Sequence, residues 1–129
     1  MLYIAIRTDK PEAELYILKD TVVTSKTVWL AHRQLLETIN LKINELLKRE
    51  KLKIIDVNGL VFYEGPGSFT GLRIGASVAN AVAAGLGVPI VSSGQDDWLQ
   101  AGVLLLQNNK NLGYIEPKYG SLAHITAPK

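Results

Sequence analysis

Residues 64–75, Glu-Gly-Pro-Gly-Ser-Phe-Thr-Gly-Leu-Arg-Ile-Gly, follow a short apolar run at 60–63 and precede a long segment rich in small residues. The stretch therefore combines a strand exit, a tight turn and a helix start, with Ser68 as the expected N-cap. Glycine is costly in conformational entropy, so four glycines beside one proline indicate positive φ or close backbone contact. This turn directs the helix that follows it and so decides the fold.

The composition predicts one globular domain in the cytoplasm. The 129 residues are 47% apolar, enough for a core of their own. The net charge is only +2, with both signs spread along the chain, so any contact with RNA would be shared with a partner. The absence of cysteine excludes disulfides and thiolate chemistry and agrees with a reducing compartment. The N-terminus lacks the pattern of a signal peptide.

Residues 74–95 contain no charged side chain and are about as long as a bilayer span. Gly85, Gly87 and Pro89 would end a helix within this segment. We therefore expect a buried helix followed by a buried strand, and no membrane association.

The order of elements predicts an α/β fold. Strands are expected at 2–6, 13–18 and 21–29, with turns at 10–12 and 19–20. A helix over about 32–51, a strand at 60–63, a helix over about 68–86, a strand at 87–91 and a helix over 97–108 follow. The order βββαβαβα predicts a mixed sheet with packed helices. Residues 109–129 are expected to form an extended or loosely docked tail.

The glycine-rich turn could cradle an anion, because it places backbone N–H groups at a helix N-terminus. A P-loop, however, requires Gly-Lys-Ser/Thr at the helix start, and here Leu72 follows Gly71. The acid of a dinucleotide fingerprint is also missing, since Ser92 and Ser93 follow the next strand. We favour a structural turn over a nucleotide site.

A row of small residues recurs every four positions in the second helix, at Gly71, Gly75, Ala79 and Ala83. Such a row permits close approach of another element. That element is either the protein's own sheet or first helix, which spacing alone slightly favours, or a helix from another chain.

Metal and acid–base chemistry have little support in the sequence. The two histidines, His32 and His124, are 92 positions apart, and no His-x-x-x-His pair occurs. Asp9 and Glu64 lie at predicted strand ends without an evident basic or nucleophilic partner. Arg73, one turn into the second helix, is expected to pair with an acid such as Glu64.

Residues 65–75, together with His32, Leu35 and Leu36 and the run at 86–91, closely resemble the signature of the TsaB (YeaZ) family. The resemblance covers about residues 1–108 and is firmest from 59 to 95. It implies a single half-domain of the actin-like, Hsp70-like ATPase (ribonuclease H-like) fold class. The chain would then comprise a TsaB-like N-terminal domain, 1–108, and an extended C-terminal tail, 109–129.

The resemblance also implies a non-catalytic partner role. TsaB-like proteins bind and activate the catalytic TsaD subunit, which transfers the threonylcarbamoyl group to adenosine in tRNA, and a TsaE ATPase joins the pair. ATP and metal would lie on those partner subunits, and this chain would contact tRNA only indirectly. The alternatives are a small nucleotide-binding hydrolase or a remnant of an M22-type peptidase, or a self-associating homodimer.

Two departures from the family pattern shape these expectations. The first turn has Arg7, Thr8 and Asp9 where the family has an Asp-Thr-Ser-like sequence, so an ATP–Mg²⁺ site of its own is not expected. The chain is also about half as long as typical members, which suggests a minimal form without the second domain, ending in a family-like segment at 125–129.

The predicted site is a helix-bundle interface with TsaD, supported by a structural loop. The predicted interface residues are His32, Leu35, Leu36, Ile39, Ile43, Phe69, Thr70, Leu72, Arg73, Gly75, Ala76, Ala79 and Ala83. The predicted loop residues are Gly65, Pro66, Gly67, Ser68 and Gly71.

Overall fold

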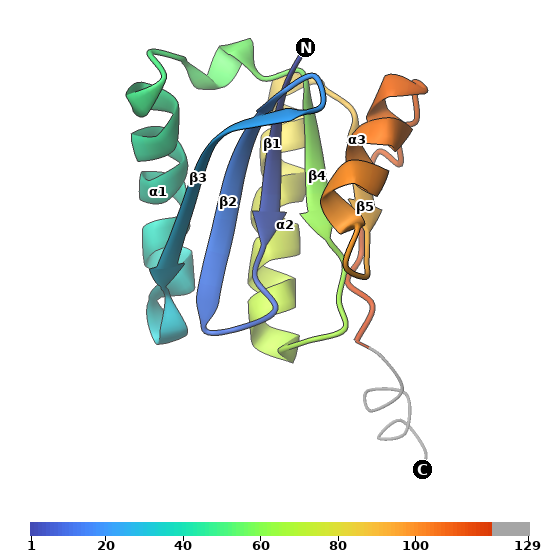
Figure 1. Cartoon of the computed structure of the whole chain (residues 1–129). Helices are drawn as coiled ribbons and strands as arrows, with labels where there is room; N and C mark the ends of the chain where they lie inside the picture. Colours follow the sequence, from blue (N-terminus) through green and yellow to red (C-terminus); the bar gives the residue numbers. More distant parts are fainter. Residues whose placement is uncertain (120–129) are drawn as a thin grey trace.

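A computed structural model describes residues 1–119 and shows a five-stranded sheet with helices on both faces (Figure 1). The predicted order of strands and helices, and with it the mixed α/β fold, is confirmed. The elements are β1 (Leu2–Arg7), β2 (Glu12–Lys19), β3 (Val22–Leu30), the 3-10 helix η1 (His32–Gln34), α1 (Leu35–Arg49), the 3-10 helix η2 (Ile54–Asp56), β4 (Gly59–Tyr63), α2 (Phe69–Leu86), β5 (Ile90–Ser93) and α3 (Trp98–Gln107).

The sheet combines a meander with two crossovers. Its strand order is β3-β2-β1-β4-β5. The three N-terminal strands pair antiparallel through short turns, and β1, β4 and β5 run parallel because α1 and α2 carry the chain back between them. The carboxyl ends of β1 and β4 therefore lie side by side, next to the start of α2.

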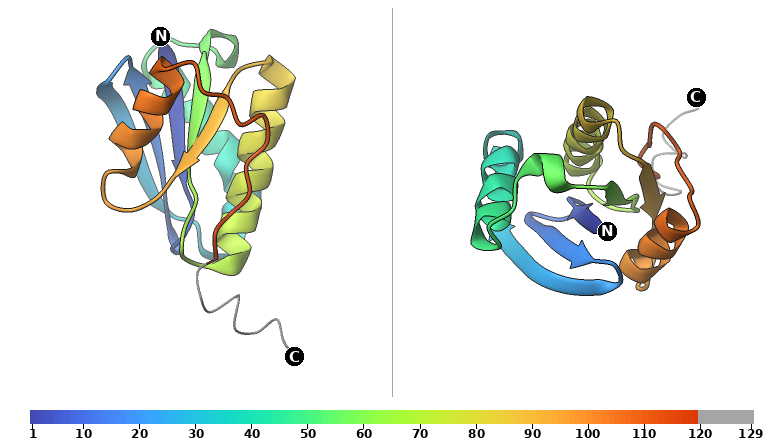
Figure 2. Two further views of the ribbon diagram at one scale, coloured as in Figure 1. Left: turned by 90° about the vertical axis from the view of Figure 1, so that its right-hand side faces the viewer. Right: turned by 90° about the horizontal axis from the view of Figure 1, so that it is seen from above.

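Alternating side chains of β1 belong to two separate hydrophobic cores, one on each face of the sheet. Leu2, Ile4 and Ile6 pack with α1 and α2, whereas Tyr3 and Ala5 pack with α3. α1 and α2 lie next to each other on one face of the sheet, and α3 lies on the other (Figure 2). Each helix therefore keeps an outer side that no strand covers.

The boundaries of α1 and β5 differ from the prediction for backbone reasons. α1 starts at Leu35, because His32 has φ 48° and residues 32–34 form a separate 3-10 helix. It ends before Lys51, whose φ of 59° turns the chain so that the amide of Leu52 bonds to the carbonyl of Leu47 at 2.9 Å. β5 begins only at Ile90, because Gly87 with φ 68° terminates α2.

The uncharged segment forms a helix of the fold. By length and apolar composition alone α2 could cross a membrane. In the structure Leu72, Ala79 and Ala83 are buried in the core beneath it. A helix followed by a strand was predicted for this segment and is confirmed.

Residues 111–119, called the strap below, form no helix or strand but are held to the domain at three places. The amide of Leu112 donates to the carbonyl of Ile90 at 2.9 Å, at the free edge of β5. Asn80 bonds both backbone groups of Ile115 at 2.9 Å, and Ile115 is only 2% exposed. The amide of Lys118 donates to the carbonyl of Glu64 at 2.7 Å. The strap thus runs along α2 to the glycine-rich turn (Figure 2).

The predicted tail of residues 109–129 includes the strap. Residues 120–129, with His124 and the family-like segment at 125–129, lie outside the described residues.

Two glycines of α2 provide a matched test of this packing. A Cβ on Gly75 would collide with Oγ1 of Thr8 and lie 2.9 Å from a ring carbon of Phe62, whereas a Cβ on Gly85 would meet nothing within 4 Å. We expect Gly75→Ala to destabilise the fold by about 1–3 kcal/mol through overpacking. Gly85→Ala should stabilise it by about 0.5–1 kcal/mol, because alanine is the better helix former. Denaturant unfolding of both variants measures the difference, and equal midpoints would contradict this packing.

Candidate functional site

The glycines of residues 64–75 allow close packing. A Cβ on Gly67 would collide with Asp9, and one on Gly71 would collide with the carbonyl oxygen of Thr8. Gly65, at φ 113°, leaves room for the carbonyl oxygen of Lys118. Each of these positions requires glycine because another backbone segment lies against it.

Several backbone groups of the turn are engaged in hydrogen bonds within the protein. The amide of Ser68 donates to the carbonyl of Asp9 at 2.9 Å, and the Ser68 hydroxyl accepts from the amide of Gly71 at 3.3 Å, as predicted for an N-cap. The buried Thr8 hydroxyl donates to the carbonyl of Gly71 at 2.8 Å. The turn therefore docks α2 onto the end of β1.

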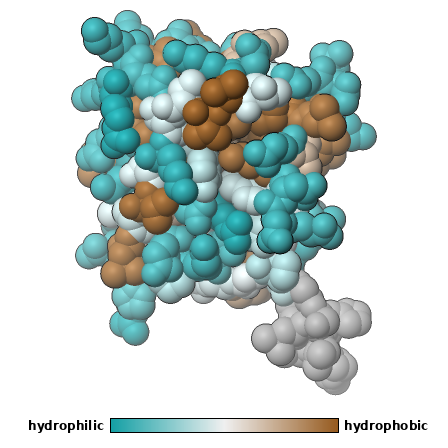
Figure 3. All heavy atoms as spheres, in the orientation of Figure 1, coloured by the Kyte–Doolittle hydropathy of each residue, from teal (hydrophilic) through white to brown (hydrophobic). Residues whose placement is uncertain are grey.

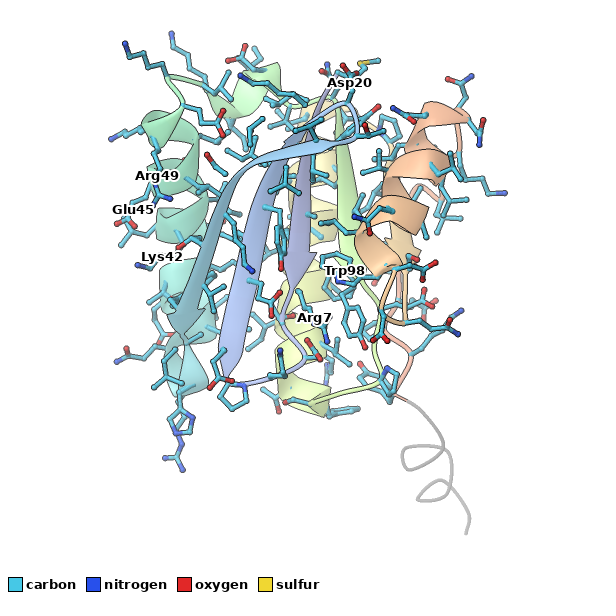
Figure 4. All side chains as sticks on the ribbon, viewed as in Figure 1. Arg7, Asp20, Lys42, Glu45, Arg49 and Trp98 are labelled. Atoms are coloured by element: carbon cyan, nitrogen blue, oxygen red, sulfur yellow. The ribbon has the colours of Figure 1, made fainter. Side chains whose placement is uncertain are left out.

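The turn after β1 does not fit a magnesium–nucleotide site. Nε of Arg7 lies 2.8 Å from Oδ1 of Asp9, and the Asp9 side chain is only 7% exposed. The guanidinium also lies 3.9 Å from the centre of the Tyr63 ring and faces Trp98 (Figure 4). The carboxylate that could bind the water shell of a metal is thus neutralised by a neighbouring cation.

The pKa values of Arg7, Glu14 and Tyr16 are shifted away from neutral pH. Burial by itself would raise the pKa of Glu14, but hydrogen bonds from Tyr16 and Lys10 outweigh it and lower this pKa. Burial and the bond to Glu14 raise the pKa of Tyr16, and Asp9 raises the pKa of Arg7 against the effect of burial. None of these shifts moves a group towards neutral pH, where a general acid or base would work.

The sequence reasoning missed this cluster, although strand register contains a signal for it. Arg7 is paired with Glu14 across β1 and β2, and Ala5 is paired with Tyr16. Residues at such positions share one face of the sheet, so the predicted hairpin, once its register is known, brings Arg7, Glu14 and Tyr16 together.

The predicted pairing of Arg73 with Glu64 is wrong. Glu64 is 3.4 Å from Nζ of Lys118 and accepts a hydrogen bond from Ser92 at 2.9 Å. Arg73 instead lies over the ring of Phe69, at 5.3 Å from its centre. The sequence showed no evident basic partner for Asp9, but the turn after β1 brings Arg7 to it, and the strap brings Lys118 to Glu64.

Eight of the thirteen predicted interface residues are buried in the chain's own core. The row is turned into the protein: Gly71 lies against Thr8 and Gly75 against Thr8 and Phe62, while Ala79 and Ala83 are buried in the core. Of the two alternatives left open by the spacing, internal packing is the one observed. The buried residues are Leu35, Ile39, Ile43, Leu72, Gly75, Ala76, Ala79 and Ala83.

The other five predicted interface residues are exposed and gather at one place. Leu36, Phe69, Thr70 and Arg73 line a hollow of about 320 Å³ between α1 and α2. His32 and Thr70 line a second hollow, of about 350 Å³, which shares Thr70 and Ile74 with the first. Leu36 is 63% exposed and Phe69 54%. The exposed residues thus form one surface at the N-terminal ends of both helices.

A second row of small residues, which the sequence reasoning missed, continues this surface along α2. Ser77, Ala81, Ala84 and Gly85 are exposed on the outer side of the helix. Arg73 is the one charged residue of α2. We call the two hollows and this row the α1–α2 face. Both rows of small residues recur about every four positions, so the sequence alone does not show which row faces the sheet and which faces solvent.

Within residues 1–119, no three His, Asp or Glu side chains lie together as metal ligands would.

Comparison with known proteins gives consistent matches. The family model described as TsaD, tRNA N6-adenosine threonylcarbamoyltransferase, matches residues 29–93. The TsaB protein of Haemophilus influenzae, a tRNA threonylcarbamoyladenosine biosynthesis protein, is 40% identical over 62 residues, which are 48% of this chain and 26% of that protein. A tRNA N6-adenosine threonylcarbamoyltransferase of Geotalea daltonii is also 40% identical over 62 residues, covering 48% of this chain and 18% of that protein.

The fold has a counterpart among solved structures. YeaZ from Pseudomonas aeruginosa superposes with a TM-score of 0.67 at 22% identity, covering 72% of this chain and 43% of that one. The matches cover about a quarter or less of the length of these curated relatives. Since the family model spans half of the chain and the TsaB and YeaZ likenesses agree with it, the chain belongs to the TsaD and TsaB/YeaZ family.

Proposed function

We propose that this chain is a non-catalytic scaffold subunit that binds a TsaD-type subunit and stabilises its active conformation for N6-threonylcarbamoyladenosine formation on tRNA. The observation that carries the proposal is the α1–α2 face. The names of the curated relatives supply the process, tRNA threonylcarbamoyladenosine biosynthesis, and the partner type.

The composition of the α1–α2 face favours burial against another helix. Solvent-facing helix sides usually carry charged residues, whereas the outer side of α2 has only Arg73 among small and apolar residues. Lys10 and Arg33 line the second hollow, so the part of the face that is depleted of charge is the outer side of α2. Depletion of charge together with exposed Leu and Phe is typical of the centre of an interface. Small outer residues let a partner helix approach closely.

The opposite face of the molecule is less suitable. Val28 and Leu30 of β3 are exposed there, but Lys26 and Glu12 lie beside them in the sheet register. Figure 3 shows the apolar patches of that side separated by hydrophilic ones. A partner docking there would have to desolvate charged groups.

In the proposed assembly the partners supply the chemistry. ATP and metal bind to the TsaD-like and TsaE-like subunits, and tRNA reaches this chain only indirectly. The complex works in the cytoplasm and needs no membrane. A homodimer through the same face is the competing arrangement, and mass measurements distinguish it.

The interface is tested by a pair of leucine substitutions. Leu36 on the α1–α2 face and Leu104 on α3 are 63% and 60% exposed, so Leu→Asp at either should leave the fold intact. We expect Leu36→Asp to weaken binding to the TsaD-type subunit of the same organism by about tenfold or more, because a carboxylate would be desolvated in the interface. Leu104→Asp should bind like the wild type.

Size-exclusion co-elution and titration calorimetry with purified subunits make the measurement. Absence of any complex with the wild-type chain, with TsaD activity unchanged, would refute the scaffold role. Weakening by Leu104→Asp alone would place the interface on the other side of the sheet.

The enzyme alternative, a small nucleotide-binding hydrolase or M22-type peptidase remnant, is tested by titrating the isolated chain with ATP and Mg²⁺. We expect no saturable heat, because Arg7 neutralises Asp9 and the glycine-rich turn packs against Thr8. A saturable signal from the wild-type chain would show a nucleotide site and overturn the non-catalytic assignment.

A further inference from the structure

The strap ends at the α1–α2 face. Its path is fixed by Asn80, which bonds Ile115 from the middle of α2, and by Glu64, which accepts from the amide of Lys118 and pairs with its side chain. Gly65 has no Cβ, and the carbonyl oxygen of Lys118 occupies the space where one would lie. The glycine-rich turn and the strap are therefore fitted to each other, and this fit positions Tyr119.

Tyr119 is half-buried and packs against Phe69, one of the exposed residues of the α1–α2 face. Its ring lies 4.5 Å from the ring of Phe69, centre to centre, at an angle of 37°. The guanidinium of Arg73 lies 5.3 Å from the centre of the same Phe69 ring. Phe69, Arg73 and Tyr119, named here the anchor cluster, thus stack together at the start of α2.

The anchor cluster combines residue types that dominate binding energy at interfaces. Tyrosine and arginine are enriched at such positions, in part because large, rigid side chains lose little entropy on binding. Within residues 1–119, Arg73 forms no ion pair, since Glu64 is already bound by Lys118. Arg73 is the one charge of α2 and has no acidic partner among residues 1–119, so it is complementary to a carboxylate on a partner that covers the helix.

We propose that the strap completes the partner-binding surface, and that the anchor cluster receives an α-helix of the TsaD-type subunit with a carboxylate opposite Arg73. The inference rests on the proposed function and adds to it a second segment of the interface, from the C-terminal side of α3. Tyr119 lies beside the hollow lined by Leu36, Phe69 and Arg73, so one partner helix can cover both.

The strap offers its own control residue. Tyr114 and Tyr119 belong to the same segment, but Tyr114 is 67% exposed and lies on the other side of Ile115 from the anchor cluster. We expect Tyr119→Ala to weaken binding to the purified TsaD-type subunit by about tenfold, whereas Tyr114→Ala changes it less than about twofold. Arg73→Glu should weaken binding at least as much, while Arg73→Lys retains most of it.

The mode of action is tested through Asn80. Asn80→Ala removes both hydrogen bonds to Ile115. We expect faster hydrogen exchange at the Ile115 amide and weaker binding in the same variant, because the anchor cluster loses the segment that positions Tyr119. Faster exchange with unchanged binding would overturn the role of the strap.

Interferometry with immobilised TsaD-type subunit and sedimentation of the chain alone separate the outcomes. If the wild type binds and Tyr119→Ala and Arg73→Glu bind equally well, the inference is wrong and the scaffold function stands. If the wild type does not bind, both are wrong. If the two variants change only the self-association of the chain, the occupant is a second copy, and the proposed TsaD helix is excluded.

Discussion

The contact between Gly75 of α2 and Thr8 at the end of β1 determines which side of α2 faces the sheet and which side faces solvent. Thr8 is buried, its hydroxyl bonds the carbonyl of Gly71, and a Cβ on either glycine would collide with it. α2 can approach the sheet this closely only with its glycine and alanine row turned inward. The outer side of the helix is thereby fixed as well. The outer side of α2 carries the second row of small, uncharged residues, and the scaffold function that we propose buries this row against another protein.

Strand and helix order could be predicted because periodicity and turn residues report it directly. The direction in which α2 faces could not be predicted, because Gly71, Gly75 and Ala79 recur with the same spacing as the outer row. Arg73 was assigned the wrong partner for a related reason: its neighbour Glu64 is taken by Lys118, which lies far away in sequence. The strap has no periodic pattern, so nothing in the sequence indicated that Asn80 would bind it. Local sequence patterns predicted the helices and strands, whereas contacts between residues distant in sequence determine which side chains are exposed.

The carboxyl end of the sheet, where open α/β folds commonly bind ligands, is closed here by the protein's own side chains. Arg7 neutralises Asp9 and stacks on Tyr63, and the strap reaches Glu64. Interactions that would bind a ligand in an enzyme instead connect β1, β4 and the strap. This closure of the sheet end agrees with the scaffold role that we propose. The glycine-rich turn connects the closed end of the sheet to the α1–α2 face, because it packs against Asp9 and Thr8 and also positions the first turn of α2.

Hydrogen–deuterium exchange of the full chain, with and without the TsaD-type subunit, tests the location of the interface most directly. Burial of the α1–α2 face predicts slower exchange in α2, in the N-terminal half of α1 and in the strap, while α3 and β3 exchange as in the free chain. Slower exchange confined to α3 and β3, with α2 and the strap unchanged, would contradict the proposed interface.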